Sequence, residues 1–257
     1  MSKRKLFSTT ALTPILMLVG SGVAFAQAPA VSGPNGSLGG FGGAWDGSGF
    51  AAALGSWTVP LGPATGGQLD GFIGTADGQI YSQFSGHYFW RDPATSLLGV
   101  YANWTQAFGN STFRIGPEAE FYANQFTFSG VAGVKTGGGD SFFGQAKGSL
   151  YLTDNTKVYV GYEYEDGSFL SAGFEHLFQP GGLSAFGEVR TGEGATGVWA
   201  GFRYYFGMPD KSLKGRDRED VAPLWLHVAD KPTTATPSPS PSPSPSPSPS
   251  PSPSPPP

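Results

Sequence analysis

The sequence predicts an all-β protein, an antiparallel up-and-down transmembrane barrel followed by a disordered C-terminal tail. Apolar and polar side chains alternate with a period of two between residues 113 and 206, in segments of about ten residues. One face of these segments carries no formal charge, whereas the other carries glutamates and arginines in mid-strand. No later run of about 18 apolar residues could form a transmembrane helix. Together these observations favour strands that cross a membrane.

The two faces of the expected strands differ in the way that lipid and lumen demand. Outward positions such as Phe121, Phe174 and Phe202 are large and aromatic, and His176 is the one polar side chain found among them in this stretch. An apolar exterior and a polar interior are typical of transmembrane barrels. The charged, lumen-lining set comprises Arg114, Glu118, Glu120, Lys147, Glu163, Glu175, Glu188, Arg190 and Arg203.

The start of the chain indicates export. Basic residues at 3–5, a short apolar run at 11–20 and the small-x-small site at 24–26 predict a signal peptide over 1–26, with a short lead at 27–35. The chain has no cysteine, which excludes disulfides, thiolate metal sites and cysteine nucleophiles. The net charge of −4, without a basic cluster interleaved with aromatics, argues against a nucleic-acid partner.

Turn sequences divide the predicted barrel, 36–207, into strands. Asp-Gly and Gly-rich pairs favour tight hairpins because they tolerate positive φ. Bacterial single-chain barrels have even strand numbers, which brings both ends of the wall to the periplasmic side. We expect twelve strands, or ten if the glycine-rich residues 36–60 stay outside the wall. The twelve are 36–45, 49–60, 67–76, 79–91, 95–107, 111–123, 125–136, 140–153, 156–166, 168–179, 182–192 and 196–206.

All connections between the expected strands are short, with no gap above about eight residues. They leave little material for a constriction loop or an inserted plug domain. The lumen is therefore expected to be closed, or left open, by side chains of the wall itself.

Two regions follow the barrel. Residues 208–236 are rich in alternating charges and contain an apolar cluster with Trp225, which indicates a solvated periplasmic stretch against the barrel mouth. The alternative is a docking or plug segment anchored by Trp225. Prolines alternate with serines over 237–257, so this part cannot join a sheet or helix. We expect a disordered, extended periplasmic spacer, with a tether toward peptidoglycan as the sharper hypothesis.

Several motifs resemble known proteins. The last expected strand, with Phe202, Tyr204 and Phe206, looks like the assembly signal that the barrel-insertion machinery reads in Gram-negative bacteria, although here the chain continues beyond it. Residues 211–220, KSLKGRDRED, resemble the K-S-L-x-x-R-x-R-E-D segment of an uncharacterised family of outer-membrane porin-like barrels from rhizobia-like alphaproteobacteria. The elements VPLG, FWRDP and LLGVY, at 59–62, 89–93 and 97–101, resemble the same family. This likeness implies an outer-membrane barrel in contact with lipid, but it implies no activity.

The predicted lumen leaves two main functions open. The first is a porin-like channel for passive passage of small solutes. The second is a non-conducting structural barrel, because buried charges pair and can fill a small lumen. With Lys135 and Glu165 included, the inward charges nearly cancel, so strong ion selectivity is not expected.

An enzyme is not expected. An outer-membrane hydrolase or acyltransferase is a distant third reading, which would require His87 to act with Ser85 or a lumen glutamate. The sequence shows no metal-ligand spacing and implies no cofactor. The oligomeric state stays open.

Overall fold

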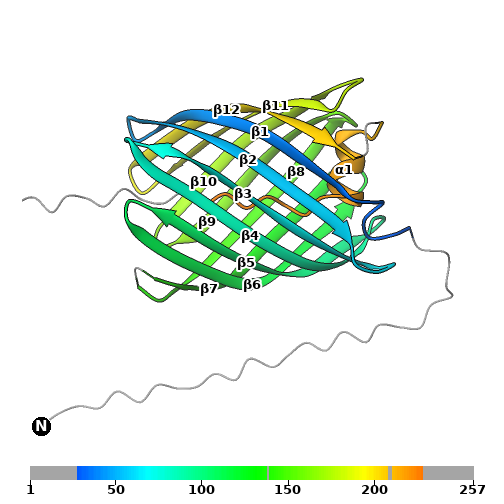
Figure 1. The fold of residues 1–257 in the computed structure, drawn as a ribbon, viewed down its shortest axis with the longest axis horizontal. Helices are drawn as coiled ribbons and strands as arrows, with labels where there is room; N and C mark the ends of the chain where they lie inside the picture. The colour runs from blue at the N-terminus through cyan, green and yellow to red at the C-terminus, as the bar shows by residue number, and fades with distance from the viewer. Residues whose placement is uncertain (1–27, 138, 208–209, 228–257) are drawn as a thin grey trace, which may run out of the picture.

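The structure, a computed structural model, describes residues 28–137, 139–207 and 210–227. Twelve antiparallel strands form one closed barrel, in which sequence neighbours pair and the first strand pairs with the last (Figure 1). The strands are β1 (Asn35–Trp45), β2 (Ser48–Pro60), β3 (Thr65–Ala76), β4 (Gln79–Asp92), β5 (Ser96–Ala107), β6 (Asn110–Ala123), β7 (Phe126–Thr136), β8 (Ser141–Thr153), β9 (Thr156–Glu165), β10 (Ser168–Phe178), β11 (Leu183–Gly192) and β12 (Ala195–Phe206). A short helix, α1 (Leu213–Glu219), follows the barrel. The predicted signal peptide and Pro-Ser tail lie outside the described residues.

The prediction of twelve strands is confirmed, and the alternative of ten is wrong. β1 pairs with β2 along its whole length and with β12 from Gly36 to Trp45, so the glycine-rich start completes the wall. Its glycines permit close approach of backbones. A Cβ on Gly43 would lie 2.0 Å from the Val198 carbonyl oxygen, a distance no side chain tolerates. The weak alternation of apolar and polar residues in this strand therefore reflects glycines that allow close strand packing, and residues 36–45 belong to the wall.

The wall has an apolar exterior and a polar interior, as the alternation predicts. Outward side chains such as Phe142, Val160 and Phe202 are 72%, 65% and 61% exposed. Such a belt of large apolar side chains suits contact with lipid. Among the residues that the structure describes, no helix is long and apolar enough to cross a membrane.

The barrel has two distinguishable ends. The near end, as we call it, contains the start of β1, the end of β12 and α1 (Figure 1). The far end contains the tight turns after β1, β3 and β9, where Asp46, Asp77 and Asp166 adopt φ of 47°, 50° and 53°. Each is followed by glycine, which accommodates the left-handed conformation of these hairpins. The Asp-Gly turn predictions are therefore confirmed.

Candidate functional site

Helix α1 lies at the near end of the barrel. The Ser212 hydroxyl accepts a hydrogen bond from the Gly215 N–H at 3.1 Å and caps the helix. The Asp217 carboxylate accepts hydrogen bonds from the Tyr151 hydroxyl and the Lys157 ammonium group, each at 2.6 Å. The charges of this motif thus fix the helix to strands β8 and β9.

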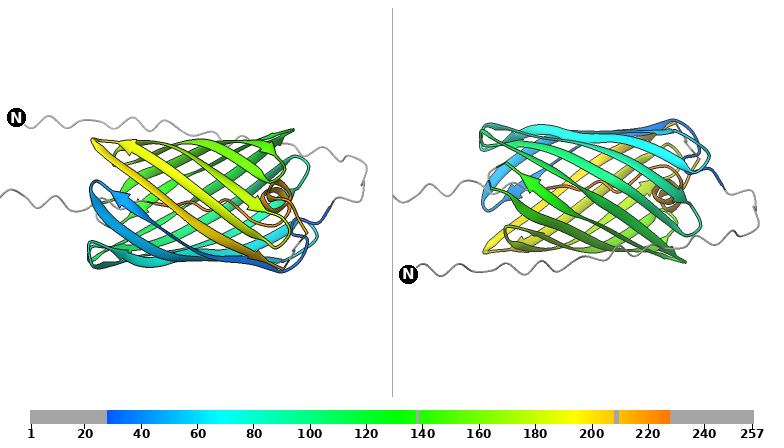
Figure 2. Two further views of the ribbon diagram at one scale, coloured as in Figure 1. Left: turned by 90° about the horizontal axis from the view of Figure 1, so that it is seen from above. Right: turned by 90° about the horizontal axis from the view of Figure 1, so that it is seen from below.

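After α1 the chain enters the barrel. Residues 221–227, which we call the lumen segment, run through the interior away from α1 (Figures 1 and 2). Strand β4 runs from the far end to the near end, so its residue numbers fall with depth from the near end. Three carbonyls of the segment accept hydrogen bonds from successively deeper β4 side chains: Val221 from Arg91 (2.5 Å), Trp225 from Gln83 (2.5 Å) and His227 from Tyr81. The segment therefore progresses from the near end toward the far end.

The expectation that wall side chains alone occupy the lumen is wrong. That argument considered the connections between strands, whereas the chain inside the barrel follows the last strand. The periplasmic-stretch interpretation also does not describe residues 221–227, because they lie within the barrel. The structure agrees with the alternative of a plug segment, in which Trp225 is 1% exposed.

Side chains of strands β3 to β8, on one side of the lumen, contact this segment, and we call this the binding side. Trp225 packs with Tyr101, Val131 and Phe143, and its indole N–H donates to a Glu118 carboxylate oxygen at 3.3 Å. Aromatic packing of this kind both removes apolar area from water and fixes the ring. The anchor is thus held by strands β5 to β8.

The wall also binds the backbone of the segment. The Gln68 carboxamide accepts from the Ala222 N–H at 2.8 Å and donates to the Ala222 carbonyl at 3.2 Å. The Gln83 carboxamide oxygen accepts from the His227 N–H at 3.0 Å while its nitrogen donates to Trp225. Buried peptide groups need such partners. The two glutamine side chains therefore provide the hydrogen bonds that a neighbouring strand would give to an extended backbone.

Three buried ionisable residues, Asp70, His87 and Glu118, lie together on the binding side, next to Trp225. His87 has Nε2 2.9 Å from an Asp70 oxygen and Nδ1 2.9 Å from a Glu118 oxygen. Ser85 instead accepts a hydrogen bond from the Asn103 side chain at 3.1 Å. His87 therefore holds two carboxylates together in the wall. Both ring nitrogens of His87 thus face carboxylates, so His87 is not paired with Ser85 as a hydrolase would require.

The opposite side of the lumen carries ion pairs next to open space. Arg190 lies 2.6 Å from Glu163 and 3.0 Å from Glu188, and Arg203 lies 3.6 Å from Glu175. These residues come from β9 to β12. Together with residues of β1 to β3 and β6 to β8, they line an open space of about 1270 Å³, solvent at its mouth included, between the lumen segment and the wall, which we call the side cavity.

Lys147 differs from the other predicted lumen cations. Its ammonium group lies over the Tyr159 ring at 4.9 Å and over the Trp225 ring at 5.6 Å. Such contacts attract a cation through the negative face of an aromatic ring. Lys147 therefore lies between the anchor of the lumen segment and the side cavity.

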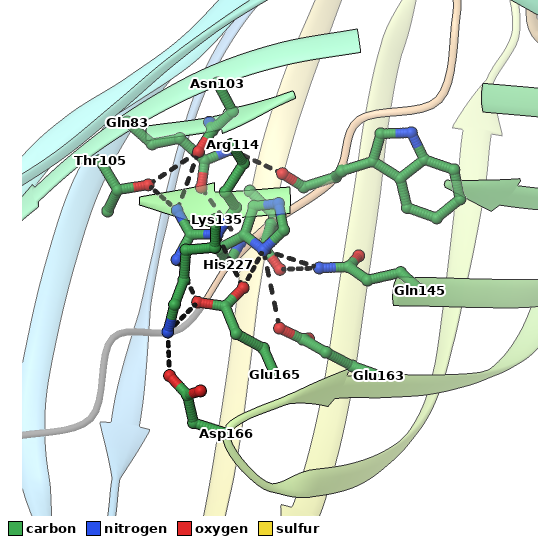
Figure 3. Close-up of polar contacts among 12 residues, drawn as sticks. Gln83, Asn103, Thr105, Arg114, Lys135, Gln145, Glu163, Glu165, Asp166 and His227 are labelled. Carbon is green, nitrogen blue, oxygen red and sulfur yellow. Dashed lines mark hydrogen bonds and ion pairs between the residues drawn. The ribbon is translucent and has the colours of Figure 1, made fainter. Parts of the chain in front are cut away.

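The far end of the lumen has its own network (Figure 3). Arg114 donates two hydrogen bonds to Glu165, at 2.7 and 2.5 Å, and Lys135 lies 3.5 Å from the same carboxylate. His227 Nδ1 lies 3.3 Å from Glu165 and 3.7 Å from Glu163. A second open space, of about 690 Å³ with adjoining solvent included, lies beside this network.

The residues of this network could be taken for a metal site. Ligand atoms of Glu163, Glu165 and His227 lie within 4.8 Å of one another. Arg190 and Arg114, however, already bind the two carboxylates. A divalent ion there would face two guanidinium groups at close range, so this cluster is better described as an ion-pair network.

The predicted lumen residues all lie inside the barrel. The set described as lumen-lining from the sequence is buried except for Lys147 and Arg203, which are half-buried. Glu118 and Glu120 share a strand face but have different partners, since Glu120 accepts from the Tyr122 hydroxyl at 2.9 Å. Their potential as a carboxylate pair is therefore not realised.

Other functional residues were missed. Gln68 and Asp70, and likewise Gln83 and His87, lie at even spacing on β3 and β4, so the same alternation read before residue 113 would have placed them inward. His227 carried no such signal, because its partners lie far away in the sequence.

The predicted assembly signal lies on the outer wall. Phe202 and Tyr204 are exposed on β12, and the Phe206 ring stacks on Trp57 with centroids 5.9 Å apart. Its reading by the assembly machinery stays a prediction.

Comparison with known proteins relates this geometry to outer-membrane channels. No protein-family model matches the chain, and no curated protein matches it. The KdgM porin in complex with disordered oligogalacturonate has a TM-score of 0.56 and 9% identity, covering 66% of this chain and 99% of that one. The COG4313 outer membrane channel from Pseudomonas putida F1 has a TM-score of 0.53 and 9% identity, covering 74% and 100%. The chain therefore has a fold similar to that of these channels.

Proposed function

We propose that the protein is a porin-like channel of the Gram-negative outer membrane that passes small polar solutes by diffusion. The observation that carries this proposal is the side cavity, an open space of about 1270 Å³ with the solvent at its mouth included, lined by charged and polar side chains in a barrel whose exterior is apolar. Solutes would move between the lumen segment and strands β8 to β12. The channel-like fold supports this function, and no catalytic role is proposed.

The solute is proposed to be neutral or weakly charged. The KdgM porin structure is a complex with disordered oligogalacturonate. In the present lumen, Arg190 and Arg203 are paired with glutamates, so these two residues present no unbalanced positive charge to the side cavity. Selective passage of anions would need a ring of one charge sign.

A second candidate is a non-conducting structural barrel. The specific observation in its favour is that the lumen segment occupies the interior and that its anchor, Trp225, is almost fully buried. In that case paired charges and the segment together close the lumen. A peptidoglycan tether formed by the tail belongs to this candidate and stays a prediction.

Conductance of the refolded full-length protein in a planar lipid bilayer separates the two candidates. A diffusion channel gives steady current with weak ion preference, because the inward charges nearly balance. Near-zero current, or rare small openings, supports the structural barrel. The matched control is Val160→Arg, which places a charge on the exposed lipid face and should impair insertion by about 2–4 kcal/mol if the residue lies near the bilayer midplane.

The proposed location has a separate test. The apolar exterior and the predicted signal peptide lead us to expect fractionation with outer membranes, resistance to extraction by salt, and different gel mobility before and after boiling. Recovery in the soluble periplasmic fraction would contradict the proposal.

A further inference from the structure

We infer that the barrel passes its own C-terminal tail through the lumen and presents residues 228–257 outside the cell. The far end would therefore be the exit of the chain, opposite α1. This reverses the sequence-based expectation of a periplasmic tail, and it adds a display function that does not depend on solute passage.

The position of the last described residue is the first step. His227 Nδ1 lies 3.3 Å from Glu165, the final residue of β9, which precedes the far-end turn at Asp166. The His227 carbonyl accepts from Tyr81, near the start of β4 and hence also near the far end. At residue 227 the chain has therefore crossed most of the lumen.

The lumen segment is also long enough for this crossing. Seven residues in extended conformation span at most about 25 Å, which matches the apolar height of a transmembrane barrel of roughly 25 Å. Its hydrogen bonds to Arg91, Gln83 and Tyr81 occur in order of depth, so it does not turn back within residues 221–227.

The far end offers an opening beyond His227. The second open space, about 690 Å³ with adjoining solvent included, is lined by Glu163 and Glu165 and by Ala107 and Asn110, next to the turn between β5 and β6. After His227 the sequence contains no aromatic residue and no charge beyond Lys231. Small side chains of this kind can occupy a narrow exit without a specific pocket.

A return to the near end would be unfavourable. The chain would have to run back through the side cavity, beside Lys157, Glu175 and Arg203, which interact with one another. From Pro232 onward it has no charged side chain, and every proline lacks a backbone donor, so only its hydroxyl and carbonyl groups could replace the water that these ions lose. The far exit is lined by paired ions as well, among them Arg114 and Lys135 with Glu165, but His227 already contacts Glu165 there, so the chain has only the remaining turn region to pass.

The orientation of the barrel then decides the compartment. Both ends of the wall of an even-stranded barrel meet at one end, which in bacterial barrels faces the periplasm. Here that is the near end, with Asn35, Phe206 and α1. The tail would accordingly lie on the extracellular side, as an uncharged chain rich in hydroxyl groups and proline.

Single cysteines test this topology, because the natural chain contains none. Three full-length variants suffice: Ser240→Cys in the tail, Asn110→Cys at the far end and Ala94→Cys at the near end, the last two in exposed positions. Intact cells are treated with a maleimide carrying a long polyethylene glycol chain, which is too large to cross the outer membrane. Labelling is normalised to the same variant denatured after extraction.

We expect Ser240→Cys and Asn110→Cys to react in intact cells and Ala94→Cys to react only after the outer membrane is permeabilised. Reaction of Ser240→Cys only after permeabilisation, together with Ala94→Cys, would overturn the inference. If Ala94→Cys alone reacted in intact cells, the tail would be periplasmic and external display would be overturned. Channel conductance has no part in these outcomes, so failure here leaves the proposed function untouched.

Discussion

The two sides of the lumen differ in what they do with charge. On the binding side, strands β3, β4 and β6 hold His87 between Asp70 and Glu118, and Trp225 donates a hydrogen bond to Glu118. On the side of the side cavity, Arg190 and Arg203 pair with glutamates that border open space. Arg190 also donates hydrogen bonds to the Leu226 carbonyl, so this side binds the lumen segment as well, but its ion pairs border an open cavity. The surroundings of a charge, rather than its sign, decide its role.

The largest expected effect is a loss of stability on substituting His87, on the binding side. His87→Leu leaves Asp70 and Glu118 facing each other without their shared partner, which should lower the free energy of unfolding by about 3–5 kcal/mol. Lys147→Met is the matched control, since loss of its ring contacts should cost only roughly 0.5–2 kcal/mol. Urea unfolding in lipid vesicles, followed by tryptophan fluorescence, measures both. Equal losses would contradict the distinction between the two sides.

The next effect concerns the hold on the lumen segment. Trp225→Ala removes the ring that packs on Tyr101, Val131 and Phe143, at a local cost of about 3–5 kcal/mol. The loosened segment should raise single-channel conductance severalfold while the barrel stays folded. Leu224→Ala, at a half-buried neighbour, should leave conductance near the wild-type value. Unchanged current in Trp225→Ala would show that the segment does not restrict the path.

The smallest expected effect is a shift in ion preference on substituting charged residues that line the side cavity. Arg190→Gln removes one positive charge next to Glu163 and Glu188, so the lining becomes more acidic and ion preference should shift toward cations. Glu188→Gln should shift it in the opposite direction. Reversal potentials in a salt gradient measure both changes. A missing shift in either variant would indicate that ions do not pass this wall.

The sequence predicts the strands of the barrel wall far better than the chain segment that lies in the lumen. Strand number, turns and the inward placement of residues such as Glu163 and Arg190 follow from alternation and Asp-Gly pairs, which are local signals. The course of the lumen segment depends on contacts between residues more than a hundred positions apart, such as Trp225 with Glu118. No local periodicity encodes such pairs. The sequence indicates Trp225 as an anchor only in the alternative of a docking or plug segment, and it does not indicate which wall residues would bind that side chain.

The hold on the lumen segment has a consequence for how the sequence can vary over evolutionary time. Gln68 and Gln83 bind the peptide groups of Ala222, Trp225 and His227, which depend little on side-chain type, so substitutions at Leu224 leave these bonds intact. Trp225 and His227, in contrast, meet specific side chains of the wall. Selection should therefore treat these two positions and their distant partners as one unit, with correlated changes. Relatives that lose this part of the chain should also lose the need for a histidine at position 87.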